Sequence, residues 1–258
     1  ALGALLGSAT LAARLVTTRV AVIGPAREAG VSAALLTEVL ADTLGRLWPN
    51  IDFSGELAEA GLQAARNAAS SGEALVDGLR HAWQPPYDVI VSVGGRAADH
   101  NSPEIVVGAD GWRVGFGDSA TCGTSPNPVG PAFAAALAAA QVFATCFAKE
   151  LEDFGVRQLD DWQADVRELF GAPELDVKPI DLEQTHIFGV GAVTHGLVWL
   201  LERWPQPAVG KLDLVDRDDY GGGNGQRYAF MPPEAMKKSK VSLVADRLRM
   251  HPHLNVTP

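Results

Sequence analysis

Residues 186–204 read HIFGVGAVTHGLVWLLERW, a short apolar strand that runs into Gly189 and Gly191 and then into a helix. The first backbone N–H groups of such a helix have no acceptor within the helix and can therefore bind an anion. Glycine, which has no side chain, lets a phosphate approach the backbone closely. The stretch predicts the strand, turn and helix of a nucleotide-binding α/β domain. Thr194 stands where a third glycine would complete the dinucleotide fingerprint, so a plain strand-to-helix turn remains an alternative.

A second strand with an acidic end follows this helix. KLDLVDRDDY, residues 211–220, is an apolar run that ends in carboxylates, and Asp216 lies 27 residues after Gly189. A carboxylate at the tip of the second strand accepts hydrogen bonds from ribose hydroxyls in nucleotide-binding folds. Nicotinamide, flavin and adenylate sites share this feature. For Asp218 and Asp219, a solvated acidic turn is the alternative.

Polar and basic residues follow in GGGNGQRY, residues 221–228, and in KKSK, residues 237–240. A site that presents ATP for attack at its α-phosphate needs donors for the β- and γ-phosphates, because charge moves onto the leaving pyrophosphate. Arg227 and Lys240 are candidates for this role, and Asn224 adds a neutral donor. Lys237 and Lys238 are interpreted as solvated residues at the start of a helix.

With these residues in order, residues 186–258 resemble the first part of the adenylation domain shared by ubiquitin-activating enzymes and the bacterial activators of sulfur-carrier proteins. That family has a glycine turn, an LVDxD segment after the second strand, an N-x-x-R motif and a later lysine. The matching positions here are Gly189, Gly191, Asp216, Asp218, Asn224, Arg227 and Lys240. The resemblance implies a Rossmann-like fold in which Asp216 binds ribose and Asn224, Arg227 and Lys240 hold the triphosphate, with Arg227 and Lys240 as the catalytic residues.

The same resemblance implies ATP and Mg²⁺ as cofactors and a ubiquitin-like or sulfur-carrier protein as partner, with a homodimer possible. The magnesium-binding aspartate of the family follows the fourth strand of the domain, so no metal ligand is expected within this chain. The first residue is not methionine and HLNVTP, residues 253–258, is predicted to be a strand, which suggests a piece of a longer protein.

The preceding residues also alternate between strand and helix patterns, which predicts mainly parallel sheets flanked by helices. We expect an N-terminal α/β unit at 1–150, a linker with a short helix at 151–182 and the start of the ATP-binding domain at 183–258. In the first unit, the first strand ends without a close glycine pair and Asp52 lies inside the second strand with no N-x-x-R after it. The unit therefore resembles an inactive adenylation-like half, with an unrelated α/β domain as the alternative.

Some family members take an arginine from the partner half to reach the ATP phosphates. Arg14 and Arg19, near the start of the first unit, are candidates, although both fit surface charges equally well. Cys122 is considered as a nucleophile, a role that requires a depressed pKa, and Cys146 is interpreted as a core residue.

Composition narrows the classes of partner. The formal net charge of −10 opposes attachment to nucleic acid or to an anionic membrane. The two cysteines, with no zinc-site spacing, indicate a reducing cytoplasm. The alanine-rich segment that begins near Pro131 is predicted to be a buried helix, with a membrane span as the alternative.

Together these features predict an ATP-dependent adenylyltransferase that activates the C-terminal carboxylate of a ubiquitin-like or sulfur-carrier protein. One alternative is an NAD- or FAD-binding oxidoreductase, which shares the glycine turn and Asp216 but leaves Arg227 and Lys240 without a role. The other is a non-catalytic scaffold of the same fold that binds the carrier protein.

Overall fold

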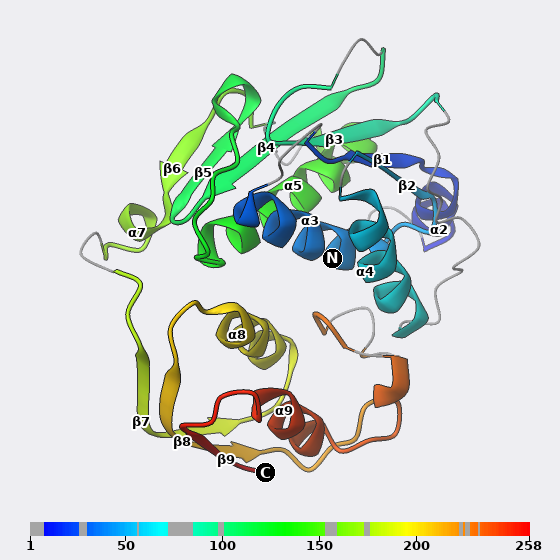
Figure 1. The fold of residues 1–258 in the computed structure, drawn as a ribbon. Helices are drawn as coiled ribbons and strands as arrows, with labels where there is room; N and C mark the ends of the chain where they lie inside the picture. Colours follow the sequence, from blue (N-terminus) through cyan, green and yellow to red (C-terminus); the bar gives the residue numbers. More distant parts are fainter. Residues whose placement is uncertain are drawn as a thin grey trace.

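The computed structural model describes residues 8–25, 30–55, 57–71, 85–97, 101–152, 159–172, 176–221, 224, 228–231 and 233–258. These residues form a mixed α/β structure with mainly parallel sheets flanked by helices, consistent with a Rossmann-like fold (Figure 1). The predicted fold class is therefore confirmed. The described chain forms two sheets, one built from the N-terminal part and one from the residues after 179.

The first sheet has six strands in the order β2-β1-β3-β4-β5-β6. Its strands are β1 (Val20–Ile23), β2 (Ile51–Ser54), β3 (Val89–Val93), β4 (Glu104–Asp110), β5 (Arg113–Phe116) and β6 (Gln163–Asp165). The first four are parallel, whereas β5 and β6 are antiparallel to their neighbours. Central strands of a parallel sheet are covered on both faces, which explains why β3, VIVSV, is buried at every position.

Helices α3 (Val31–Gly45), α4 (Ala58–Ser71) and α5 (Val129–Cys146) lie on the side of this sheet that faces the second unit (Figure 1). The first unit also contains α2 (Ser8–Thr17), α6 (Ala148–Leu151), α7 (Val166–Leu169) and the short 3-10 helix η2 (Gly117–Ser119). Helices α3 and α4 approach closely at Gly45, where a Cβ atom would lie 2.8 Å from the Cα atom of Ala65. Small residues at this crossing therefore set the distance between the helices.

Helix α5 is long and apolar enough to cross a membrane by length and composition, the one such helix in the described part of the chain. Ten of its residues, among them Ala134, Ala138 and Val142, are nevertheless buried against the sheet and α3. This packing agrees with the prediction of a buried helix. The cytoplasmic location remains a prediction.

The second sheet contains β7 (Ile180–Phe188), β8 (Ala208–Val215) and β9 (Leu254–Thr257), all parallel and in that order. Helix α8 (Ala192–Arg203) connects β7 to β8, and η5 (Pro233–Ala235) and α9 (Lys240–Leu248) precede β9. The final strand is thus present, as predicted. Val198, Leu201, Leu212 and Val244 are members of the core between this sheet and its helices.

The segment expected to be a linker, 151–182, differs from that expectation. Strand β6 extends the first sheet by pairing with β5, and α7 contacts α5. Strand β7 already begins at Ile180. The sequence of β6, QAD, contains no run of apolar residues that would predict a strand. An edge strand such as β6 is only partly buried and does not need one.

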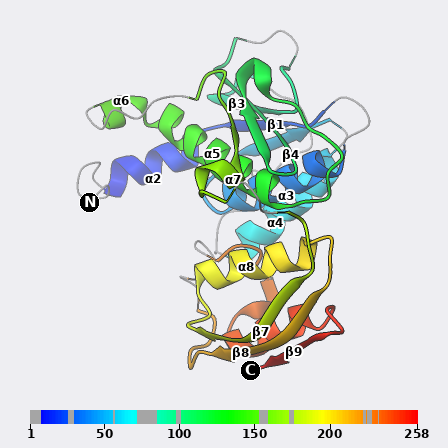
Figure 2. The same ribbon diagram turned by 90° about the vertical axis from the view of Figure 1, so that its left-hand side faces the viewer.

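Helix α8 lies between the second sheet and helices α3 and α4 of the first unit, as the two views agree (Figures 1 and 2). Glu38 of α3 forms an ion pair with Arg203 of α8 and accepts a hydrogen bond from the indole of Trp199. The two units are therefore in direct contact through buried and half-buried side chains.

Candidate functional site

The predicted glycine turn lies at the carboxyl end of β7. Gly189 has a φ of +91°, a backbone conformation that favours glycine, and Gly191 is the N-cap of α8. A Cβ atom on either glycine would meet no atom of the described residues within 4 Å. The surface of the turn is thus open where a phosphate would approach the start of α8.

Thr194, the departure from the three-glycine pattern, has a local role in this turn. Its hydroxyl donates a hydrogen bond to the carbonyl of Gly189 at 3.0 Å, and the residue is buried. The side chain therefore fixes the turn from the inside and leaves the outer surface of Gly191 open.

Asp216 connects the ends of β7 and β8. Its Oδ2 atom accepts a hydrogen bond from the Val190 amide at 2.7 Å, and its Oδ1 atom accepts one from the Asp218 amide at 2.9 Å. Burial opposes ionisation, but these amides and the charge of Lys240 outweigh it and lower the pKa of Asp216. Each carboxylate oxygen can accept a second hydrogen bond. The two bonds from backbone amides therefore still allow Asp216 to accept one from a ribose hydroxyl.

Lys240 is brought to the same edge by α9, of which it is the first residue. Its ammonium lies 3.3 Å from Asp218 and 3.8 Å from Asp216, and 5.6 Å from the centre of the Tyr228 ring. Burial alone would lower the pKa of Lys240, but the hydrogen bond to Asp218 and its other neighbours raise it. The lysine is therefore a buried, charged group beside the two carboxylates.

Asn224 lies in the loop after β8, where its side-chain oxygen accepts a hydrogen bond from the Gly221 amide at 2.7 Å. Its side-chain NH2 group takes no part in this contact, and its assignment as a donor stays a prediction. Arg227 lies outside the described residues. Lys237 and Lys238 are exposed, in line with their interpretation as solvated residues.

A buried aromatic cluster under this site was not predicted. The His195 ring stacks on Tyr228 with 5.1 Å between ring centres, and its Nε2 atom shares a hydrogen bond with the Tyr220 hydroxyl. Burial, followed by the positive charge of Arg247, lowers the pKa of His195 to about 4. At neutral pH the ring is uncharged. Burial likewise raises the pKa of the Tyr220 hydroxyl.

The first-unit candidates are engaged within their own unit. Arg14 forms an ion pair with Glu150, and Arg19 forms one with Asp52. Burial raises the pKa of the Cys122 thiol, the opposite of what a nucleophile requires. Burial also raises the pKa of Cys146 to about 12, which fits its interpretation as a core residue.

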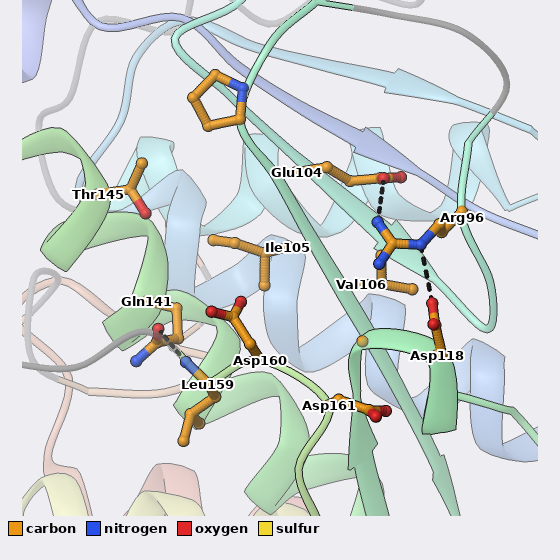
Figure 3. A pocket seen from close by; sticks show the side chains of 12 residues that line it. Arg96, Glu104, Ile105, Val106, Asp118, Gln141, Thr145, Leu159, Asp160 and Asp161 are labelled. Atoms are coloured by element: carbon orange, nitrogen blue, oxygen red, sulfur yellow. Dashed lines mark hydrogen bonds and ion pairs between the residues drawn. The ribbon is translucent and has the colours of Figure 1, made fainter.

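A hollow of about 280 Å³ lies within the first unit, beside the start of β4 (Figure 3). On its wall Arg96 contacts Asp118 at 3.0 Å and Glu104 at 3.5 Å. All the residues that line it precede residue 162, so it is separate from the glycine turn. The described residues contain no group of three or more His, Cys, Asp or Glu side chains arranged to hold a metal ion.

No family model matches the chain. A relative in Sinorhizobium fredii, "Uncharacterized protein y4jF", is 32% identical over 149 residues, which covers 55% of this chain. The chain covers 28% of that relative's length. The relative's name states no activity, so the functional argument rests on the geometry of the site.

Proposed function

We propose that the second unit binds ATP and that the protein is an adenylyltransferase, which activates the C-terminal carboxylate of a ubiquitin-like or sulfur-carrier protein. One observation carries the proposal. The open glycine turn, the carboxylates of Asp216 and Asp218 and the ammonium of Lys240 lie together at the carboxyl edge of one parallel sheet. Ligands of open parallel α/β sheets bind outside this edge.

The residues fit the parts of a nucleotide. The open position over Gly191 would let a phosphate approach the N–H groups at the start of α8, which have no acceptor within the helix. Asp216, an ionised carboxylate with acceptor capacity left, suits ribose hydroxyls.

The cations suit the outer phosphates. Lys240 is held by an ion pair that a phosphate, with its higher charge, competes for. We assign Asn224 and Arg227 to the same outer phosphates on the resemblance of their N-x-x-R spacing to the family's.

In this proposal the chain's residues act by position and charge. The glycine turn holds the α-phosphate in line with the incoming carboxylate, and Lys240 and Arg227 stabilise negative charge on the pyrophosphate as it leaves. Magnesium, when bound, neutralises further charge on these phosphates. A pre-arranged set of donors of this kind commonly contributes the largest share of catalysis.

ATP–pyrophosphate exchange tests the proposal. The full-length protein is assayed with magnesium and with candidate carrier proteins encoded nearby, each compared with a version that lacks its terminal glycine. We expect exchange that depends on the carrier and vanishes on truncation. The Arg227→Ala variant is expected to lose about two orders of magnitude of exchange, as for removal of one charge-stabilising donor. Near-normal exchange in that variant would remove Arg227 from the mechanism.

A non-catalytic scaffold is the second candidate, and the pairing of Lys240 favours it. Lys240, whose charge is neutralised by Asp216 and Asp218, could form a structural ion pair with them and have no part in catalysis. Carrier binding without ATP consumption would establish the scaffold. An absorbance or fluorescence spectrum of a bound flavin or nicotinamide would instead favour the oxidoreductase.

A further inference from the structure

The loop 228–230 is anchored on the first unit by a buried ion pair. Asp42 lies on α3 and Arg46 is the C-cap residue of this helix, one turn later; their side chains are only 5% exposed. The Nη2 atom of Arg46 lies 2.6 Å from each carboxylate oxygen of Asp42. The pair faces the second unit and is separated from the loop by more than 180 residues of sequence.

Both members of the pair bind backbone groups of the loop. Arg46 donates a hydrogen bond from Nη1 to the carbonyl of Tyr228, and Asp42 accepts one from the Phe230 amide at 3.1 Å. Burial raises the pKa of Asp42, and the positive charge of the Arg46 guanidinium opposes this rise. The ionised form of the carboxyl group is therefore stabilised by its arginine. A backbone held at both a donor and an acceptor is fixed in position and in orientation.

The conformation of Phe230 shows that this anchoring is specific. Its φ of +55° is a strained backbone conformation for a residue other than glycine, and such residues persist where their surroundings determine them. Here the ring stacks on Trp199 at 5.2 Å, and Arg247 of α9 contacts the carbonyl at 3.5 Å. The loop is thus fixed between α3 of the first unit and α8 and α9 of the second.

The anchored segment reaches the nucleotide site through Tyr228. This residue directly follows Arg227, and its ring stacks on His195 and lies under the ammonium of Lys240. A shift of the Tyr228 backbone therefore moves the ring below Lys240. Gly191 and Asp216 have no contact with this loop among the described interactions.

We propose that the Asp42–Arg46 pair is a positioning element supplied by the first unit, which holds Tyr228 and Phe230 in place and thereby keeps the Tyr228 ring under Lys240, the cation assigned to the outer phosphates of the nucleotide. This inference rests on the proposed function. It assigns the first unit a share in recognition of the triphosphate, with no direct contact with ATP. Loss of the pair should therefore weaken binding of ATP more than binding of AMP, which relies on the glycine turn and Asp216.

The test is the ratio of the Kd for ATP to the Kd for AMP, measured by calorimetry on the whole protein. For Asp42→Asn we expect the Kd for ATP to rise about tenfold or more, as on loss of a charge-assisted hydrogen bond, and the Kd for AMP to stay within about twofold. Glu38→Gln is the matched control. It makes the same chemical change one turn earlier on α3, at an ion pair that bridges the two units but does not touch the loop backbone.

Asp42→Asn leaves Arg46 buried without its charge partner, so the double variant Asp42→Asn, Arg46→Gln is made in parallel. It removes both charges and should show the same selective loss of ATP affinity. An unchanged ratio in a folded variant, or an equal change in Glu38→Gln, overturns the inference while ATP binding by the unaltered protein upholds the proposed site. Absence of ATP and AMP binding by the unaltered protein overturns both.

Discussion

The Gly191→Ala variant tests nucleotide binding without disturbing the fold. No atom of the described residues lies within 4 Å of the position that the added methyl group would occupy. In Gly191→Ala the backbone already has φ −104° and ψ −161°, which alanine adopts without strain. Alanine is a poorer N-cap than glycine by roughly 0.5–1 kcal/mol. It also restricts the unfolded chain, a stabilising effect of about 0.4–1 kcal/mol. We expect the free energy of unfolding to change by less than about 1 kcal/mol.

Binding should respond very differently. The methyl group would occupy the surface on which the proposed phosphate sits and would separate it from one or two N–H groups at the start of α8. Each hydrogen bond to a charged group contributes about 1.5–3 kcal/mol. The expected loss is therefore roughly 2–4 kcal/mol, or a Kd for ATP raised about 30-fold to 1,000-fold. Calorimetric titration with ATP, together with urea unfolding of the same preparation, measures both quantities.

Gly196→Ala provides the matched control. Gly196 lies in the same helix, and its Cβ position is equally open, but it is five residues past the N-cap and so more than one turn into the helix. This variant should gain about 0.5–1 kcal/mol of stability from helix propensity and bind ATP as the unaltered protein does. Normal ATP affinity in folded Gly191→Ala would refute the placement of the phosphate over the glycine turn.

Three further predictions concern stability and reactivity. Because the pKa of His195 is lowered from 6.5 to about 4, the unfolded state binds more protons between these pH values; we expect unfolding free energy to fall by about 3 kcal/mol from pH 6.5 to pH 4, and this slope to flatten in His195→Gln. An equal slope in both proteins would show that other groups cause it. Gly45→Ala should destabilise the protein by about 1–3 kcal/mol in urea despite better helix propensity, because its methyl group would lie 2.8 Å from Ala65; a more stable variant would mean that α3 and α4 move apart freely. Cys122, which is partly buried, and Cys146, which is buried, both have a raised thiol pKa and should react slowly with a thiol reagent at neutral pH until the protein is unfolded; rapid labelling of the native protein would contradict the raised pKa.

The local elements of the fold could be predicted from the sequence because their signals lie within a few residues of each other. The run from His186 to Trp204 carries its own strand, turn and helix, and Asp216 follows the next strand. Since parallel strands end at one edge of a sheet, the meeting of the glycine turn and Asp216 follows once the strands are recognised. The position of Lys240 at the same edge depends on where α9 begins.

Contacts between distant segments could not be predicted in this way. Asp42 and Arg46 have the spacing of an ordinary surface ion pair on a helix, and nothing nearby in the sequence indicates that they hold the backbone of Tyr228 and Phe230. The stacking of His195 on Tyr228 likewise depends on how the loop returns to α8. Such tertiary contacts are set by the packing of whole elements, which residue patterns do not encode locally.

The interface at α8 bears on how the molecule unfolds. A sheet of three strands with helices on it is near the lower limit for independent stability, and here Trp199 is 2% exposed through contacts that include the other unit. Separation of the units would expose this ring and open the charged contacts of α3 to water. We therefore expect both sheets to melt in one cooperative transition, and residues 176–258 alone to lack an autonomous fold. The C-terminal third of the chain, which carries the proposed nucleotide site, would then depend for its stability on the rest of the chain.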